Sequence, residues 1–369
     1  MIASEHMHIL HTESSCGWGG QEIRILTEAR GLQNRGHRVT LICPAEAPIY
    51  AAAQRMGLQA IALPIARKRL RGLFALRRWL AANDVDVINT HSSTDTWLVA
   101  LARLTLPGCA PIVRTRHVST KIKNTRHTRW LYQTATRHIV TTGEALKRQL
   151  VIENGFDQTR ITSVPTGIDL KRFQPRDMNA ARRTLELDPA RRYLGIVATL
   201  RNWKGHTYLL QVFANLAQRY PDWDLILVGD GPQRQNLERR IDELRLRERV
   251  RMTGNRDDVE TWLNAFDAFV LPSYGEEGVS QSVMQAMASG LPVVSTTVGA
   301  IGEAVVHEQT GILVAPRDEA QLESALVRLI DDPTLRNRFS AAARSRAEKY
   351  FGTDRMLDAM EEIFRVTQK

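Results

Sequence analysis

The feature that most constrains the fold is an alternation of short apolar runs with longer segments of helical periodicity. In the first half of the chain, the apolar runs predict strands at 7–11, 38–43, 59–63, 85–90, 111–116 and 138–141. Helical spacing lies between them, at 20–35, 70–82 and 94–104. The runs are continuously apolar, which is typical of parallel strands covered by helices on both faces. The first half therefore predicts a doubly wound parallel sheet.

A turn-rich connector at 164–175 separates this series from a second one. The second series predicts strands at 193–198, 224–228, 250–252, 268–271, 292–295 and 311–314, and helices at 205–219, 233–244, 279–289 and 354–365. A length of 369 residues agrees with two domains of ordinary size. We therefore expect an α/β protein with two Rossmann-like domains, 1–165 and 166–351, facing each other across a cleft. A last helix of about 352–369 is expected to pack back on the first domain.

The positive charge of the chain is concentrated in the first half. Residues 1–165 hold 22 Lys and Arg against 11 Asp and Glu, whereas the rest holds 28 against 29. Such an excess predicts an anionic partner: a nucleic acid, a membrane surface or a phosphorylated substrate. A basic and apolar segment at 67–80 fits either a helix on an anionic membrane or a packed helix with a solvated basic face.

The sequence also indicates a compartment. No signal peptide and no apolar run of membrane-spanning length is visible. The three cysteines fit neither a zinc site nor a disulfide framework, so free thiols are expected. These features favour a protein of the cytoplasm and leave open a peripheral contact with the cytoplasmic face of the inner membrane.

Glycine turns follow predicted strands in both halves. Gly19 and Gly20 precede the first helix, and Gly229 and Gly231 end another strand. Such turns let a ligand approach the backbone, and a helix N-terminus favours an anion. A tight turn without any ligand explains the first pair equally well. The dinucleotide and P-loop fingerprints are not present in the sequence.

Two further segments carry candidate chemistry. Arg201 and Lys204 follow the first strand of the second half and suit a diphosphate, whose charge grows as it leaves. The segment 271–295 is predicted as strand, glycine turn, helix and strand. Glu277 is expected on its turn, Gly278, Val279 and Ser280 are expected to offer N–H groups at the helix start, and Gln285 lies two turns further on.

Taken in order, these segments resemble a family, the retaining GT-B glycosyltransferases of family four. The resemblance covers nearly the whole chain. It rests on Arg35-Gly-His-Arg-Val39, on the connector 164–173, on Val228-Gly-Asp-Gly-Pro232 and on the segment 277–294. It implies transfer of a sugar from a nucleotide-sugar donor, linked to UDP or GDP, with retention of configuration, in cell-envelope polysaccharide or lipopolysaccharide synthesis.

The resemblance also implies roles for single residues. Glu277 would contact hydroxyls of the transferred sugar, Lys204 the donor diphosphate and Glu303 the nucleotide. His117 would lie near the anomeric carbon of the donor. The chain departs from the family pattern at Gln285, where a glutamate usually holds the ribose, and at Thr199, where an arginine is usual. We expect Gln285 to bind ribose with altered hydrogen bonds, and Arg201 to supply the missing charge.

No cofactor and no metal is expected, because cations and helix N-termini already neutralise the diphosphate. Two D-x-D patterns, at 84–86 and 222–224, fall at strand starts, away from the expected cleft. A nucleotide-sugar epimerase and a non-enzymatic basic nucleic-acid-binding protein are the alternative functions. The Lys204 and Glu277 motifs favour the transferase. No nucleic-acid motif is visible, so a nucleic-acid partner is not expected.

The first domain is expected to bind the acceptor, an anionic or lipid-linked glycan. Basic residues cluster after two of its predicted strands, at 67–78 and at 114–129. Charge that aids only solubility is the alternative explanation. The expected acceptor contacts are His91, Ser92, Arg116, Lys121, Lys123 and Arg126.

Overall fold

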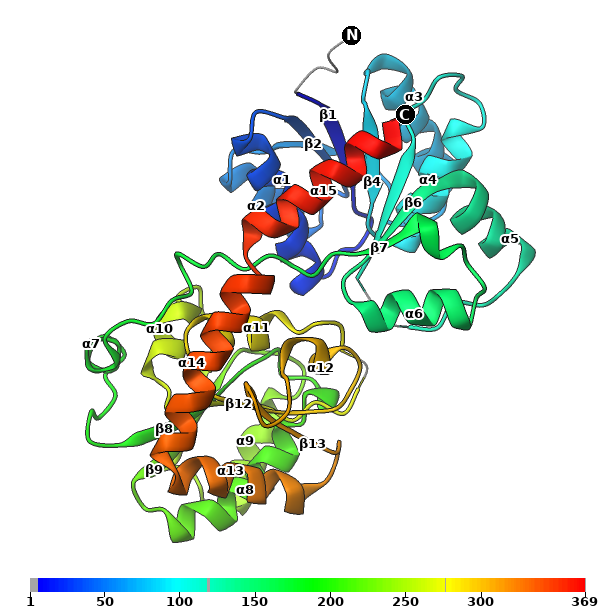
Figure 1. Cartoon of the computed structure of the whole chain (residues 1–369). Coiled ribbons are helices and arrows are strands. Elements are labelled where there is room, and N and C mark those ends of the chain that lie inside the picture. The colour runs from blue at the N-terminus through cyan, green and yellow to red at the C-terminus, as the bar shows by residue number, and fades with distance from the viewer. Residues whose placement is uncertain (1–5, 118–119, 276, 369) are drawn as a thin grey trace. The chain divides into compact units, whose positions relative to one another are not determined.

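The computed structural model describes residues 6–117, 120–275 and 277–368. The chain forms two compact units: unit 1 is residues 1–167 with 353–369, and unit 2 is residues 168–352. Each unit contains one parallel sheet with helices on both faces (Figure 1). The predicted α/β fold class is therefore confirmed.

The sheet of unit 1 has seven strands in the order β3-β2-β1-β4-β5-β6-β7, all paired in parallel. The strands are β1 (His8–Thr12), β2 (Arg38–Cys43), β3 (Gln59–Ala62), β4 (Val87–Thr90), β5 (Ile112–Arg116), β6 (Thr136–Thr141) and β7 (Ile161–Ser163). The helices are α1 (Gly20–Asn34), α2 (Pro48–Arg55), α3 (Leu70–Ala82), α4 (Ser93–Arg103), α5 (Arg126–Arg129), α6 (Glu144–Ile152) and α15 (Thr353–Gln368), with a π-helix at Trp130–Ala135 and a 3-10 turn at Gln158–Arg160.

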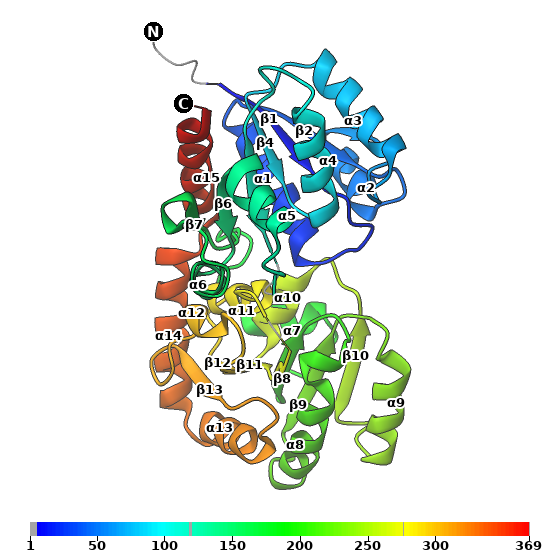
Figure 2. The ribbon, with the colours of Figure 1, turned by 90° about the vertical axis from the view of Figure 1, so that its right-hand side faces the viewer.

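Alternate residues of these strands point into two hydrophobic clusters. Ile9 packs in one cluster with side chains of α1, α2 and α15, whereas Leu10 packs in the other with α3, α4 and α6. Figures 1 and 2 show α15 alongside α1. Arg35, directly after α1, donates to Asp358 at 2.7 Å and to Glu361 at 3.0 Å. Apolar packing and these ion pairs together attach the last helix to the sheet of unit 1.

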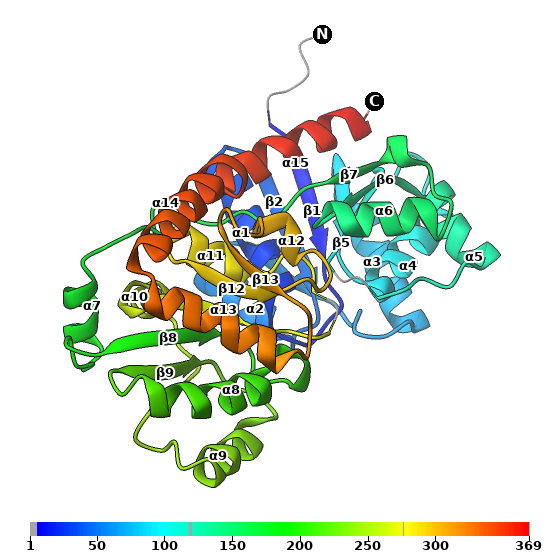
Figure 3. The same ribbon diagram turned by 60° about the horizontal axis from the view of Figure 1, so that its bottom comes forward.

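The sheet of unit 2 has six parallel strands in the order β10-β9-β8-β11-β12-β13. They are β8 (Arg192–Val197), β9 (Trp223–Val228), β10 (Val250–Gly254), β11 (Ala268–Leu271), β12 (Val293–Thr296) and β13 (Gly311–Val314). The helices are α7 (Met178–Thr184), α8 (His206–Arg219), α9 (Arg234–Glu243), α10 (Val259–Ala265), α11 (Gln281–Ala288), α12 (Ile301–Ala304), α13 (Glu319–Asp331) and α14 (Pro333–Tyr350), with a 3-10 turn at Asn202–Lys204. Figure 3 shows α13 and α14 against this sheet.

The predicted elements agree with the structure to within a few residues, with one helix start corrected. The predicted ranges did not include β7 or the helices α2, α5, α6, α7, α10, α12, α13 and α14. The edge strand β7 was not predicted, because three residues are too short to show a period. The helix predicted to begin at residue 279 begins at Gln281, with Ser280 as an extended N-cap. Gly278 and Val279 therefore lie in the loop before α11. None of the helices in the described part of the chain is long and apolar enough to cross a membrane.

Candidate active site

The candidate site residues of unit 2 lie at one edge of its sheet. Strands β8, β9, β11 and β12 are parallel neighbours, so the loops that follow them meet at their carboxyl ends. These loops carry Arg201 and Lys204, then Gly229 and Gly231, then Glu277, and finally Glu303 on α12. The backbone N–H of Tyr274 donates to the carbonyl of Trp203 at 2.8 Å, which joins the loop after β8 to the loop after β11.

This junction brings Lys204 and Glu277 together. The Lys204 Nζ donates to Glu277 Oε1 at 2.7 Å, and the Ser273 hydroxyl donates to the same oxygen at 2.8 Å. The two charged side chains are only 19% and 10% exposed, so solvent screens the pair weakly. The Lys204 ammonium and the Glu277 carboxylate are thus fixed next to each other at the strand ends. There the ammonium can bind a phosphate, and the carboxylate can accept a hydrogen bond from a hydroxyl.

Packing within unit 2 explains why glycine occupies positions 229 and 299 at this edge of the sheet. A Cβ at Gly229 would lie 2.1 Å from the carbonyl oxygen of Ala198, and one at Gly299 would lie 2.0 Å from that of Glu277. Gly299 has a φ of +58°, and the next residue, Ala300, donates its N–H to the Glu277 carbonyl at 3.0 Å. The Gly299 turn therefore supports the backbone of Glu277. The glycine at 229 is required by the chain itself, whether or not a nucleotide approaches it.

In the described part of unit 2, three other predicted donor residues make no ion pair with Lys204 or Glu277. Arg201 is exposed, with its guanidinium carbon 5.1 Å from the centre of the Trp203 ring. Gln285 is half-buried on α11. Ser280 is buried, and its hydroxyl lies 3.3 Å from that of Ser282. Donor contacts by these residues stay predictions.

Unit 1 carries a second group of polar residues at the carboxyl ends of β1, β4 and β5, three neighbouring strands. Three imidazoles form a line there. His11 Nδ1 lies 2.9 Å from His91 Nε2, and His91 Nδ1 lies 3.0 Å from His117 Nε2. His91 is 3% exposed and uses both ring nitrogens within this line. The acceptor contact expected of His91 stays a prediction, and in this structure both of its ring nitrogens pair with other histidines.

Two carboxyl groups beside the histidines were missed in the sequence. Glu13 accepts hydrogen bonds from the Ser92 hydroxyl at 2.5 Å and the Ser15 N–H at 2.6 Å. Asp95 accepts from the Thr12 hydroxyl at 2.8 Å and from the backbone of His91 at 2.9 Å. Burial raises the pKa of both carboxyls, and the Asp95 charge raises that of Glu13 further. The Ser92-x-x-Asp95 capping box was a usable signal for Asp95, whereas an isolated Glu13 gave none.

The predicted acceptor residues in the basic segment after β5 divide into two kinds. Arg116 is 7% exposed, and its guanidinium donates to the Tyr132 hydroxyl at 3.3 Å and to the Thr120 backbone. Lys121, Lys123 and Arg126 are exposed, and Lys121 lies 3.6 Å from a Glu153 oxygen. Exposed charge for a ligand of unit 1 is thus found at 121–126, whereas Arg116 has internal partners.

The glycine turn of unit 1 lies at the start of α1. Gly19 is the N-cap of this helix, and Gly20 is its first residue.

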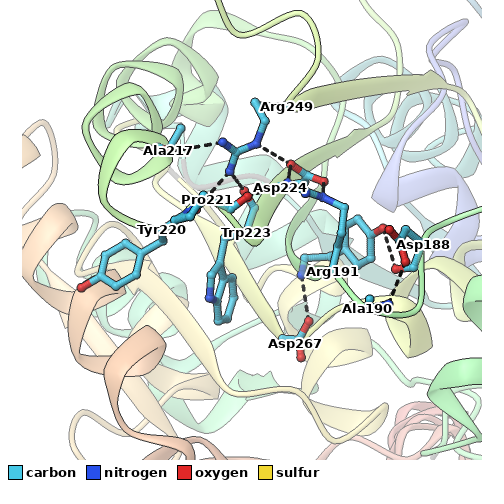
Figure 4. A network of polar contacts seen from close by, with 11 residues as sticks. Asp188, Ala190, Arg191, Ala217, Tyr220, Pro221, Trp223, Asp224, Arg249 and Asp267 are labelled. Carbon is cyan, nitrogen blue, oxygen red and sulfur yellow. Dashed lines mark hydrogen bonds and ion pairs between the residues drawn. The ribbon is translucent and has the colours of Figure 1, made fainter.

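One aspartate of each D-x-D pattern, Asp224 and Asp86, has internal partners as well. Figure 4 shows the Asp224 carboxylate with Arg191 and Arg249. Arg191 Nη2 donates to Asp224 Oδ1 at 2.6 Å, and Arg249 Nε donates to the same oxygen at 2.8 Å. In unit 1, Asp86 Oδ2 accepts the N–H of His8 at 2.6 Å. These aspartates hold strand starts together, at the edge of each sheet opposite the candidate site.

Comparison with solved structures defines the fold. The fold is similar to that of a glycosyltransferase from Rickettsia africae, with a TM-score of 0.88 and 18% identity over 99% of both chains. It is also similar to Anabaena Alr3699/HepE in complex with UDP-glucose, with a TM-score of 0.85 and 20% identity over 98% of this chain and 100% of that one. The two parallel sheets are those of GT-B glycosyltransferases.

Sequence comparison gives the family. Residues 18–172 match "Glycosyltransferase Family 4", and residues 191–332 match "Glycosyl transferases group 1". The lipopolysaccharide core biosynthesis mannosyltransferase of Rhizobium meliloti is 31% identical over 68% of this chain and 72% of its own length. A D-inositol 3-phosphate glycosyltransferase of Pseudarthrobacter chlorophenolicus is 30% identical over 74% and 69%. The chain belongs to the group 1, or family four, glycosyltransferases.

Proposed function

We propose that this glycosyltransferase moves a sugar from a UDP- or GDP-linked donor to a glycan or lipid-linked acceptor of the cell envelope, with retention of configuration. The observation that carries the proposal is the Lys204–Glu277 pair at the strand ends of unit 2. Lys204 would bind the donor diphosphate, and Glu277 the hydroxyls of the sugar. The relatives support the envelope acceptor: one is the lipopolysaccharide core mannosyltransferase, and another is an Escherichia coli galactosyltransferase named for a diphosphoundecaprenol acceptor.

The proposal is tested by ligand screening followed by product analysis. UDP and GDP are compared for their shift of the melting temperature, and the sugars linked to the better nucleotide are then incubated with candidate acceptors. We expect a new glycosidic bond whose anomeric configuration, measured by NMR, matches that of the donor. Conversion of the nucleotide sugar to its epimer without an acceptor would identify an epimerase instead. Stabilisation by oligonucleotides alone would contradict both enzymes.

We expect transfer to be independent of divalent metal, because cations are proposed to neutralise the diphosphate. EDTA should leave kcat/KM unchanged, and so should Asp224→Asn, whose carboxylate binds two arginines. The same substitution should lower the free energy of unfolding by about 1.5–3 kcal/mol, because a charged hydrogen-bond acceptor is lost. Activity that disappears with EDTA and returns with manganese would refute metal independence.

The exposed basic residues at 121–126 are proposed to bind an anionic acceptor. Reversing Lys121, Lys123 and Arg126 to glutamate should raise the acceptor KM about tenfold or more and leave the donor KM unchanged, with an effect that weakens in high salt. A matched control reverses three other exposed cations of unit 1, Arg55, Arg137 and Arg148. Equal acceptor KM values for the two triple variants would show that total charge, and not this segment, is responsible.

Helix α3 is proposed to contact the anionic membrane surface. Leu70 and Phe74, one helical turn apart, are 70% and 63% exposed, while Gly72, Leu76 and Leu80 face the core. Replacing both exposed residues with serine should weaken binding to phosphatidylglycerol vesicles about tenfold or more. The reason is that the leucine and phenylalanine side chains are proposed to move from water into the membrane surface on binding, a gain that serine lacks. Ile23 on α1 and Ile152 on α6, 41% and 77% exposed, provide the control pair. Unchanged co-sedimentation of the α3 variant would exclude this surface.

A further inference from the structure

His11, His91 and His117 form a hydrogen-bonded line in unit 1. Its rings belong to the ends of three adjacent strands, and their centres are 5.2 Å apart at both steps, with interplanar angles of 8° and 35°. Each hydrogen bond joins the Nδ1 of one ring to the Nε2 of the next. The nitrogens pair with one another instead of converging on a point, and no metal-binding group of three ligands occurs within residues 6–117, 120–275 and 277–368.

The pattern of nitrogens constrains the protons. A neutral imidazole has one N–H donor and one bare acceptor nitrogen. His91 uses both nitrogens, so it donates to one neighbour and accepts from the other. Because each bond runs from Nδ1 to Nε2, all three rings must carry the proton on Nδ1, or all three on Nε2. The proton position on His117 is thus coupled, through two hydrogen bonds, to that on His11.

The surroundings keep the line neutral. Burial lowers the pKa of each ring, that of His11 to about 3, and Arg24 and Arg114 further lower the pKa of His91 and His117. The carboxyls of Glu13 and Asp95 beside the line are occupied by hydroxyl and N–H donors. At the buried end, His11 Nε2 has no hydrogen-bond partner among the residues that the structure describes. No described group at that end therefore selects one tautomer over the other.

We propose that His91 and His11 are positioning residues for His117: they hold its ring in place and tie its tautomer to theirs, so that one proton arrangement is shared by the three histidines. The consequence for catalysis rests on the proposed function, in which His117 lies near the anomeric carbon. The nitrogen of His117 that is left for a ligand is Nδ1, which donates in the all-Nδ1 arrangement and accepts in the all-Nε2 arrangement. In either arrangement the neutral ring does not oppose the positive charge that develops on the sugar.

The shared tautomer is tested first without any substrate. The full chain is labelled with 15N-histidine, and the ring nitrogens of the three residues are measured by NMR, with single variants used for assignment. We expect the same tautomer at His11, His91 and His117. A different tautomer at His117 and His91 would overturn the proposal, and this readout does not depend on the enzyme having the activity assigned to it.

Activity then tests the positioning role. Asparagine at position 91 retains an amide near the Nδ1 that meets His117, whereas glutamine places its amide near the Nε2 that meets His11. We expect His91→Gln to lower kcat about tenfold, the effect of one lost hydrogen bond, with little change in donor KM, and His91→Asn to recover most of the loss. His138→Gln is the control, because His138 lies on β6 and bonds Thr162 at 2.9 Å, outside the line.

The outcomes separate the two proposals. A kcat for His91→Gln equal to that of His138→Gln, in folded proteins, would overturn the positioning role. A shared tautomer in a protein that transfers sugar from no nucleotide donor would refute the proposed function while leaving the coupled line intact.

Discussion

Replacing Glu277 with alanine is expected to lower kcat/KM for sugar transfer by about two to three orders of magnitude. The carboxylate is 10% exposed and is positioned by Lys204 and Ser273, so it requires little reorganisation to accept hydroxyl hydrogen bonds from the donor sugar. Glu277→Gln should lose most of the same activity, because the amide cannot replace a charge that pairs with Lys204. Both variants should fold, since the residue lies in a loop.

A matched control exists in the same unit. Glu260 pairs with Arg172 at 2.7 Å, the same distance that joins Glu277 to Lys204, but its side chain is 21% exposed and it lies on α10. Glu260→Gln should leave kcat/KM within about twofold of the wild type. Steady-state kinetics and circular dichroism of both variants decide the matter. Loss of the folded state in Glu277→Ala would assign the carboxylate a structural role instead.

Removing both cations, with Lys204→Met and Arg201→Ala, is expected to lower kcat/KM about 100-fold or more, and Lys204→Met alone should account for most of the loss. Lys204 is held at 2.7 Å from a carboxylate in a weakly screened position, whereas Arg201 is exposed. The donor KM should rise and the acceptor KM should stay the same. Lys171→Met, at an exposed position of the same unit, is the control. A double variant with wild-type kcat/KM would remove the diphosphate site from this loop.

The direct contact between Lys204 and Glu277 adds a quantitative expectation. Residues in contact do not contribute independently, so the loss in the Lys204→Met, Glu277→Gln variant should be smaller than the product of the two single losses. If the loss in the double variant equals the product of the two single losses, the free energies are additive. The pair seen in the structure would then be absent when the donor is bound.

Much of the fold was predictable because its signals are local. The helix at 70–82 and the strand at 311–314 were predicted with the bounds that the structure has, since apolar periodicity depends on neighbours in the chain. The Gly-rich turns and the segment around Glu277 were predicted for the same reason. Their spacing also carried the family resemblance, which the sequence comparisons confirmed.

The tertiary structure decided which side chains meet. The sequence placed Lys204 and Glu277 after two separate strands, and the order of the sheet brought them within 2.7 Å. The line of histidines was not predicted, because His11 and His91 are 80 positions apart and become neighbours only when β4 pairs with β1. Burial decided the rest: Arg116, predicted as an acceptor contact, has internal partners, while Lys121, Lys123 and Arg126 stay exposed. Local residue patterns determine most of the strands and turns, whereas the pairing of strands distant in sequence determines which loops share an edge.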